Sequence, residues 1–300
     1  MMKKIFYILN RFVYKIIGPA ASTRLAHGFV GNLALRIILA RSKPKIYELD
    51  HGIRLKLSPK QALHLGVLHL GTINPLETKL LGIILKRGGI VFDAGAYVDG
   101  WYSLIAAKLV GFAGHVYAFE PNPRIYKQLK RNIALNEADN ITLEKLALSD
   151  NSQITNFYDG DMASSLSISQ ASDFGDNFRA KSYVIKTTSL IDYIKKHRIS
   201  HVDLIKLDIE GSEYRVLKAA RKLLIKRDAP DLLVEVVSEF LKQDEDLLFK
   251  LLNGVGYQAY SIHPAGLRVY TQGFDVGRTL NIFFTKKQSV ATSVDYGKIS

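Results

Sequence analysis

Acidic residues stand where several hydrophobic runs of the sequence end. One run ends in Asp93, a second in Glu120 and a third in Asp208 and Glu210, while Glu235 lies inside a fourth. A carboxylate in a buried strand is costly unless it is paired or bound to a ligand. If the runs are parallel strands, their carboxyl ends meet at one edge of a sheet, where such folds bind ligands. The acids therefore predict a ligand site.

A purely structural interpretation of the third run stays open. Lys206, Asp208 and Glu210 share one face of the predicted strand, so Lys206 could simply neutralise Asp208. Glu210 and Glu213 could also face the N-terminus of the following helix, where negative charge is favourable.

The turn after Asp93 limits which ligand fits the site. Residues 91–104 read VFDAGAYVDGWYSL, which predicts a strand, a turn with Gly95 and Gly100, and the start of a helix. A dinucleotide turn would read G-x-G-x-x-G and a P-loop would end in GK[ST], and this turn matches neither. Asp93 and Asp99 would repel a phosphate, whereas a cationic amine would suit them.

Glu120 supplies a second group for such a ligand. It lies 20 residues beyond Gly100, where doubly wound folds place the carboxylate that binds ribose hydroxyls. A ligand with an amino acid at one end, a ribose and an adenine is S-adenosylmethionine. We therefore expect S-adenosylmethionine as the cofactor.

Strand-like and helical patterns alternate along most of the chain. The alternation predicts an α/β fold with a doubly wound parallel sheet that helices cover on both faces. The polar segment 150–182, which contains GDMASSLS, interrupts it and is predicted to be a lid or a substrate-contacting loop. The predicted strands cover 90–93, 115–120, 141–148, 182–188, 202–210, 231–237, 257–263 and 279–287, and the predicted helices 76–88, 101–110, 123–136, 189–197, 212–224 and 245–254.

The N-terminal segment is strongly basic. The chain has a formal net charge of +13, and no acidic residue precedes Glu48. In residues 3–18, KKIFYILNRFVYKIIG, apolar residues recur at helical spacing, as in helices that lie on anionic membranes. A helix packed on the main domain is the alternative. The run is too short to span a bilayer and lacks the cleavage site of a secretory signal.

These features predict a cytoplasmic protein that contacts the inner face of a membrane peripherally through residues 1–20. We expect no nucleic-acid partner, because the basic residues are not interleaved with aromatics. The absence of cysteine excludes disulfides and thiolate metal sites. The predicted segments are a basic amphipathic leader at 1–45, a β-hairpin extension at 46–75 with its turn at His51 and Gly52, a cofactor-binding domain at 76–287 and a flexible tail at 288–300.

Several blocks of the sequence resemble one family. They read VFDAGAYVDGWYSL, VYAFEPNPRIYKQLKRNIALN, GDMASSL, VIKTTSLIDYI, VDLIKLDIEGSEYRVLKAA and LLVEV. In this order, over residues 76–285, they resemble the FkbM-type S-adenosylmethionine-dependent methyltransferases. The resemblance implies a Rossmann-like class I methyltransferase sheet of seven strands whose last strand, TLNIFFTKK, is antiparallel, with an N-terminal helical and β-hairpin extension. It also implies O-methylation of a hydroxyl on a sugar, a glycan or glycolipid, or another small acceptor.

The resemblance also assigns roles to residues. The common family turn has an Asn where this chain has Tyr97, and Asp99 makes the turn one residue longer. Asp208 and Glu210 would face the methyl group and the acceptor, with Gly211 beside them. The cofactor-binding residues would be Asp93, Gly95, Ala96 and Tyr97 at the methionine end, Glu120 at the ribose, and Asn122 and Ala147 at the adenine.

Methyl transfer is an in-line displacement, for which the protein mainly supplies alignment. A hydroxyl acceptor must also lose its proton, and we expect Asp208 or Glu210 to accept it. The same acids could instead bind Mg²⁺, but no dedicated ligand cluster is evident, so no metal is expected. His263 is another candidate base, with a structural hydrogen bond as its alternative role.

Two other functions compete with this interpretation. A nicotinamide-dependent Rossmann oxidoreductase would share the sheet, although it would need a third glycine in the turn after Asp93. A non-catalytic module that docks on a membrane surface would use the basic leader alone.

Overall fold

The structure is a computed structural model of the 300-residue chain. The chain divides into two compact units, with the boundary between Thr78 and Lys79. The predicted membrane-contacting segment, the GDMASSLS stretch and the predicted tail lie outside the described residues, so these expectations stay predictions, as do the bounds of the four predicted segments. The described residues are 44–57, 67, 71–159, 181–237, 244–271 and 279–287.

The first unit contains the predicted hairpin. Strands β1 (Lys45–Glu48) and β2 (Arg54–Leu57) pair in antiparallel register. A short 3₁₀ turn, η1 (Asp50–Gly52), joins them, and its residues His51 and Gly52 have positive φ values of 59° and 64°. The hairpin and its turn are therefore as predicted.

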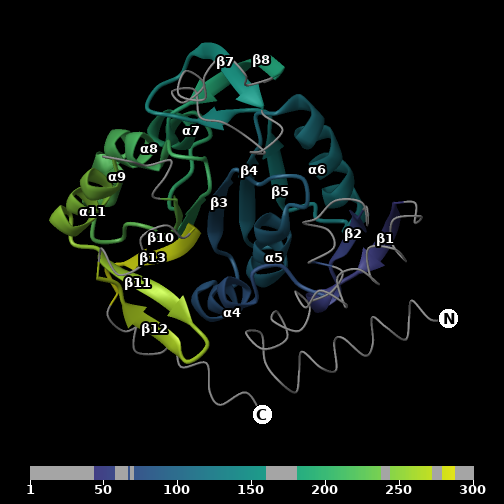
Figure 1. The fold of residues 1–300 in the computed structure, drawn as a ribbon, viewed down its shortest axis with the longest axis horizontal. Coiled ribbons are helices and arrows are strands. Elements are labelled where there is room, and N and C mark those ends of the chain that lie inside the picture. Colours follow the sequence, from purple (N-terminus) through teal and green to yellow (C-terminus); the bar gives the residue numbers. More distant parts are fainter. Residues whose placement is uncertain are drawn as a thin grey trace, which may run out of the picture. The chain divides into compact units, whose positions relative to one another are not determined.

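The second unit is built on an eight-stranded sheet (Figure 1). Its strands follow the order β12-β11-β13-β10-β9-β3-β4-β5. The five strands from β10 to β5 are parallel, so their carboxyl ends share one edge. The strands are β3 (Ile90–Ala94), β4 (His115–Phe119), β5 (Ile141–Glu144), β9 (Leu204–Leu207), β10 (Asp231–Val237), β11 (Gln258–His263), β12 (Gly266–Val269) and β13 (Thr279–Thr285).

The last strand is antiparallel, as predicted. β13 lies between β10 and β11 and runs antiparallel to both. The eighth strand, β12, was not predicted; it follows β11 after a two-residue turn, Pro264 and Ala265. This turn lacks the Asn-Gly type of signal by which a tight hairpin is recognised in a sequence.

Helices cover the sheet, and most begin where the sequence predicts. The Asn122 side chain caps α6 by accepting hydrogen bonds from the backbone N–H groups of Arg124 and Ile125, as N-cap residues do. The helix predicted at 212–224 is two helices, α8 and α9, which meet at Ala220. The helices are α4 (Pro75–Ile84), α5 (Trp101–Val110), α6 (Pro123–Leu135), α7 (Leu190–Lys196), α8 (Glu213–Ala219), α9 (Arg221–Leu224) and α11 (Asp244–Gly254).

A separate three-stranded sheet corrects two predictions. It has the order β6-β8-β7 and consists of β6 (Ala147–Leu148), β7 (Ile154–Asp159) and β8 (Lys181–Thr188). The strand predicted at 141–148 is therefore divided between two sheets, and the predicted loop at 150–182 begins with a strand. The Thr187 hydroxyl fixes the junction, because it donates to the Asn151 carbonyl at 2.8 Å.

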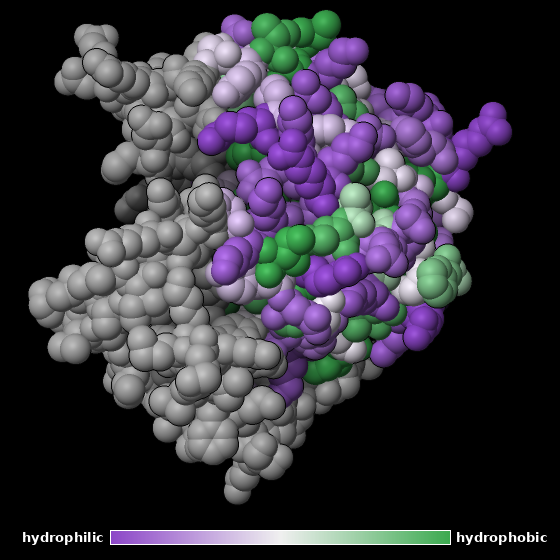
Figure 2. Space-filling model, turned by 90° about the vertical axis from the view of Figure 1, so that its right-hand side faces the viewer, coloured by the Kyte–Doolittle hydropathy of each residue, from purple (hydrophilic) through white to green (hydrophobic). Residues whose placement is uncertain are grey.

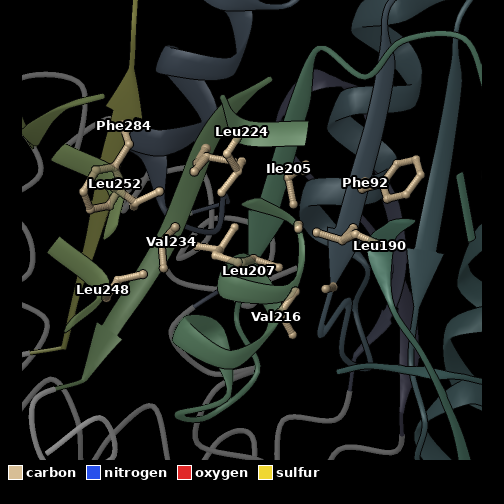
Figure 3. Close-up of a cluster of buried hydrophobic side chains, with 14 of the residues drawn as sticks. Phe92, Leu190, Ile205, Leu207, Val216, Leu224, Val234, Leu248, Leu252 and Phe284 are labelled. Carbon is tan, nitrogen blue, oxygen red and sulfur yellow. The ribbon is translucent and has the colours of Figure 1, made fainter. Parts of the chain in front are cut away.

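The main hydrophobic core joins the sheet to the helices on one of its faces (Figure 3). Strands β9 and β10 contribute Ile205, Leu207 and Val234, which are fully buried. Figure 3 shows helix side chains packed against them. Because the helices pack against β9 and β10, the residues just beyond the carboxyl ends of these strands are held in place. The labelled helix residues are Leu190, Val216, Leu224, Leu248 and Leu252.

Helix α6 presents a basic face to solvent. Its exposed residues include Arg124, Lys127, Lys130 and Arg131, while Leu129 is buried. Figure 2, which views the side where α6 lies in Figure 1, shows mostly hydrophilic side chains interrupted by separate hydrophobic patches. Among the described helices, none has the length and apolarity needed to cross a bilayer.

Two neighbouring leucines of α11 test the core. Leu248 is fully buried and Leu247 is 40% exposed. Leu248→Ala should lower the free energy of unfolding by about 2–5 kcal/mol, because it removes buried methyl groups and leaves a cavity. Leu247→Ala should change it by less than about 0.5 kcal/mol. Denaturant unfolding followed by circular dichroism measures both, and equal losses would contradict the core described here.

Candidate active site

Asp93 is buried at the carboxyl end of β3. It is 2% exposed, and the Ser103 hydroxyl of α5 donates to its Oδ2 at 2.5 Å. Burial raises the pKa of Asp93 to about 6, although the Ser103 hydrogen bond and the charge of Lys206 lower it, and the charge of Asp208 raises it further. A pKa of about 6 leaves this carboxyl mainly ionised at neutral pH, but much closer to protonation than an exposed aspartate.

The next residue, Gly95, joins two turns of the site. Its φ is +79°, and a Cβ at this position would lie 1.8 Å from the Asp208 carbonyl oxygen. The N–H groups of Gly95 and Ala96 both donate to the Phe119 carbonyl, at 3.1 and 3.2 Å. The turn after β3 therefore lies directly against the turn after β9 and the end of β4, which leaves no room for a side chain at position 95.

The rest of the first turn contains the two departures from the family pattern, Tyr97 and Asp99. Tyr97 has a φ of 57°, a left-handed conformation in which Asn is more common than an aromatic residue. The inserted Asp99 accepts a hydrogen bond from the Trp101 N–H at 3.0 Å and so satisfies the first turn of α5. Burial raises the pKa of Asp99 to about 6, despite that hydrogen bond.

Glu120 directly follows β4, the strand beside the one that carries Asp93. β3 and β4 are parallel neighbours, and Ala94 is in register with Phe119, the residue before Glu120. Glu120 is 4% exposed, and one carboxylate oxygen accepts from the Asn122 N–H at 2.8 Å. The predicted pair of acids on adjacent strand ends is therefore present.

The two residues predicted to face the adenine, Asn122 and Ala147, lie in different elements. The Asn122 side chain is fully buried as the cap of α6. Ala147 lies in β6 and pairs with Thr187, so it is not at the end of a main-sheet strand as predicted. That end is Glu144, whose carbonyl accepts from the Glu120 N–H at 3.0 Å. The strand breaks after Glu144 because the chain leaves for the second sheet.

Lys206 is the centre of the site's charge. It is 1% exposed, and its Nζ lies 3.2 Å from Asp208 Oδ2 and 3.2 Å from the Leu207 carbonyl oxygen. The ammonium also lies 5.1 Å from the centre of the Tyr102 ring, a cation–π distance. Lys206 is in register with Asp93 on β3. The ion pair between Lys206 and Asp208, which the purely structural interpretation left open, is present.

Glu235 completes this arrangement from β10. Burial raises the pKa of Glu235, as do the charge of Asp208 and the hydrogen bond that Glu235 donates to it. Burial also raises the pKa of Asp208, but Lys206 and the hydrogen bonds from Lys206 and Glu235 outweigh it and hold that pKa below its usual range. Near neutral pH, Asp208 is therefore ionised and Glu235 carries a proton.

The turn after β9 holds the remaining acids. β9 ends at Leu207, not at 210 as predicted, so Asp208 and Glu210 lie in a turn rather than on a strand. Glu210 and Gly211 both have positive φ, 55° and 93°. A left-handed backbone conformation is strained for a residue other than glycine, and residues strained in this way cluster at functional sites. Burial raises the pKa of Glu210 to about 8, and the charges of Asp208 and Glu213 raise it further.

Glu213 supports this turn from the start of α8. It is 1% exposed, and its Oε1 accepts from the Ile209 N–H at 2.9 Å. Glu213 thus holds the turn that precedes α8, which agrees with a structural role near the start of that helix. Its Oε2 has no hydrogen-bond partner among the described residues. Burial raises the pKa of Glu213 to about 7.

Two other candidates are not part of this cluster. His263 Nε2 lies 2.9 Å from the Ser261 hydroxyl on β11, and β13 and β10 separate β11 from β9 in the sheet. His263 therefore has the structural contact that its alternative interpretation predicts. In the part of the chain that the structure describes, no three His, Asp or Glu side chains converge as a metal site would require.

A family model decides the chain's classification. The methyltransferase FkbM domain model matches residues 93–259, which is more than half of the chain and contains all the acids described above. The chain belongs to the FkbM methyltransferase family. Its doubly wound sheet with an antiparallel last strand is a class I methyltransferase sheet, and S-adenosylmethionine is the cofactor of this family.

Solved structures give more distant likenesses. The FkbM methyltransferase from Methylobacillus flagellatus KT is 20% identical with a TM-score of 0.43; the match covers 68% of this chain and 45% of that one. This chain thus spans less than half of that protein. TYW2 from M. jannaschii, crystallised with AdoMet, is 16% identical with a TM-score of 0.41, covering 81% and 85%. Aeropyrum pernix fibrillarin, with natively bound S-adenosyl-L-methionine, is 15% identical with a TM-score of 0.39, covering 70% and 74%.

The comparison with curated protein sequences gave no match. The chain's family is therefore given by its match to the FkbM domain model.

Gly95 provides a direct test of the contact between the two turns. Gly95→Ala should lower the free energy of unfolding by about 3 kcal/mol, because it combines a positive φ with a clash against backbone. Gly82→Ala is the matched control, since a Cβ at this helical position meets nothing within 4 Å. That control should stabilise the protein by about 0.5–1 kcal/mol. If Gly95→Ala were as stable as the wild type, the turns would not be in contact.

The raised pKa values predict a pH dependence of stability. Glu213 ionises at about 7 in the folded protein but at about 4 when unfolded. Between these values the folded state binds more protons, so stability should fall as pH rises from about 4 to 7. Glu213→Gln keeps an oxygen for the Ile209 N–H and should flatten this decline, whereas the exposed Asp228→Asn should not. Urea unfolding across this pH range tests it, and an unchanged slope in Glu213→Gln would contradict it.

Proposed function

We propose that this FkbM-family methyltransferase transfers the methyl group of S-adenosylmethionine to a hydroxyl of a sugar, a glycan or glycolipid, or another small acceptor. The observation that carries the proposal is the contact of Gly95 with Asp208. It brings the glycine turn after β3 against the acidic turn after β9. A donor on the first turn and a hydroxyl on the second would thus be neighbours, as methyl transfer requires.

The residues present fit the proposed cofactor. Asp93, Gly95, Ala96 and Tyr97 would hold its methionine end, because a buried carboxyl beside backbone without side chains suits an ammonium group. Glu120 would accept hydrogen bonds from the ribose hydroxyls. The adenine contacts predicted for Asn122, whose side chain caps α6, and for Ala147, which lies in β6, stay predictions.

The charge of the site favours a cationic donor. The carboxyls of Asp93, Asp99 and Glu210 have pKa values raised by burial to about 6, 6 and 8. A nearby positive charge lowers such values and so favours the ionised forms. The cationic ammonium and sulfonium groups of S-adenosylmethionine would therefore shift these carboxyls, and Glu210 most of all, toward their ionised forms.

Glu210 is the better candidate for the base. S-adenosylmethionine supplies an electrophilic methyl group, and the acceptor oxygen must lose its proton as it attacks. Proton transfer is most efficient when the pKa of the base lies near the working pH, and the raised pKa of Glu210, about 8, would suit work near neutral pH. Asp208 is already engaged by Lys206 and Glu235, so its proposed role is to orient the acceptor. The products would be a methylated hydroxyl, S-adenosylhomocysteine and a protonated Glu210.

The competing functions have less support. Membership in a methyltransferase family argues against a nicotinamide oxidoreductase. A non-catalytic membrane module would leave the strained Glu210 turn without a use. Peripheral contact of residues 1–20 with the inner face of a membrane is compatible with catalysis and is kept as a proposal.

Substitutions of single acids separate binding from chemistry. Glu210→Gln should lower turnover about 10²–10⁴-fold while the dissociation constant for S-adenosylmethionine changes less than twofold. Glu120→Gln should instead weaken cofactor binding. The exposed Asp139→Asn is the matched control and should change neither. The assay measures S-adenosylhomocysteine released with a panel of sugars, glycolipids and small alcohols, beside calorimetric titration of S-adenosylmethionine.

Each outcome has a clear meaning. Wild-type turnover in Glu210→Gln would remove the proposed base. Absence of S-adenosylmethionine binding by the wild-type protein would remove the proposed donor site itself.

A further inference from the structure

The opposite edge of the main sheet, at the amino ends of its parallel strands, exposes two apolar side chains. Phe112 is fully exposed in the loop between α5 and β4, and Ile225 is 53% exposed just before the loop that enters β10. β4 and β10 are separated by β3 and β9 in the sheet, so these strands begin roughly 15 Å apart. Both side chains thus belong to one edge, which lies at the far end of the strands from the acidic site.

The Phe112 loop is a fixed structure. The Gly114 N–H donates to the Gly111 carbonyl at 3.0 Å, and the Asn140 side-chain amide donates to the same carbonyl at 3.0 Å. A Cβ on Gly114 would lie 2.5 Å from Val110 Cβ, so the loop has no room for a larger residue there. Its backbone is held closely while Phe112 projects into solvent. Exposing an aromatic ring in this way has an energetic cost, which a partner that buries the ring would recover.

Basic residues surround both apolar side chains. Lys86 and Arg87 are exposed in the loop before β3, and the Arg87 guanidinium packs against Gly111, next to Phe112. Lys226 and Arg227, both exposed, follow Ile225 directly. Each apolar side chain is therefore accompanied by a pair of positive charges.

Two acids on this edge already form hydrogen bonds or ion pairs within the fold. Asp203 accepts from the Ile90 N–H at 2.7 Å, and Asp231 accepts from Thr285 at 2.6 Å and pairs with Lys287 at 3.1 Å. Among the described residues of this edge, the exposed acids are Asp228, beside Arg227, and Glu137 and Asp139 in the loop after α6, and the Asp203 side chain is 43% exposed and lies 3.3 Å from His201.

We propose that this edge docks on an anionic lipid bilayer, with Phe112 and Ile225 in the interfacial layer and the four flanking basic residues at the lipid phosphates. Aromatic and aliphatic side chains both gain from that layer, and juxtamembrane Lys and Arg residues are attracted to anionic headgroups. A nucleic acid would stack on Phe112 but has no comparable use for Ile225. The inference concerns a different surface from the methyl-transfer site and does not depend on its acceptor.

A tryptophan probe tests insertion directly. Trp101 is the one tryptophan of the sequence and is 1% exposed, so a tryptophan at position 112 can be followed against a buried background. In the full chain, Phe112→Trp should show a blue-shifted emission with vesicles of phosphatidylcholine and phosphatidylglycerol, and quenching by brominated lipid. Neither change should occur with pure phosphatidylcholine vesicles. An unshifted, unquenched spectrum on anionic vesicles would overturn the proposal.

Vesicle flotation measures the contribution of each feature. Phe112→Ser and the double change Lys86→Glu with Arg87→Glu should each weaken binding to anionic vesicles at least tenfold. Val184→Ser, at an exposed position on β8, and Lys127→Glu with Lys130→Glu on α6 are the matched controls and should change binding less than twofold. Circular dichroism and S-adenosylmethionine binding verify folding. Equal losses in test and control variants, or full competition by single-stranded DNA with no effect of Ile225→Ser, would also overturn the proposal.

Discussion

A single buried ammonium group organises the candidate active site. Among the described residues, Lys206 is the one lysine or arginine with a buried side chain, and it lies between carboxyl groups from neighbouring strands. Its charge acts on Asp93, Asp208 and Glu235 at once. One positive charge cannot neutralise three carboxylates in a medium where isolated charges are costly. The site therefore holds a firmly ionised Asp208 beside acids whose pKa values are raised, of which Glu235 keeps its proton near neutral pH.

This constraint explains why the turns are shaped as they are. The carboxyl groups have to converge on Lys206 from β3, β9 and β10, so the backbone beyond each strand has little freedom. Gly95 permits the closest approach, while Tyr97 and Glu210 accept left-handed conformations that are unfavourable for their residue types. The core under β9 and β10 supports this strain. Folding energy from a hydrophobic cluster is thus used to hold polar groups in a fixed geometry.

Local signals in the sequence predicted much of this arrangement. The turn around Gly95 and the cap at Asn122 are short-range features, and strand order alone places Asp93 beside Glu120. The end of β5 at Glu144 could not be predicted, because the chain leaves the sheet there to pair with a distant strand. The protonation of Glu235 was equally inaccessible, since it depends on burial and on Asp208, neither of which a single run of sequence encodes.

The contact between Gly95 and residue 208 involves the main chain on both sides. No exchange of side chain at 208 can therefore relieve or replace it, and the two turns behave as one piece. A relative that acquires a different acceptor has to keep this piece unchanged. Diversification would then be confined to peripheral elements, such as β7, which forms the edge of a separate sheet and pairs there with β8.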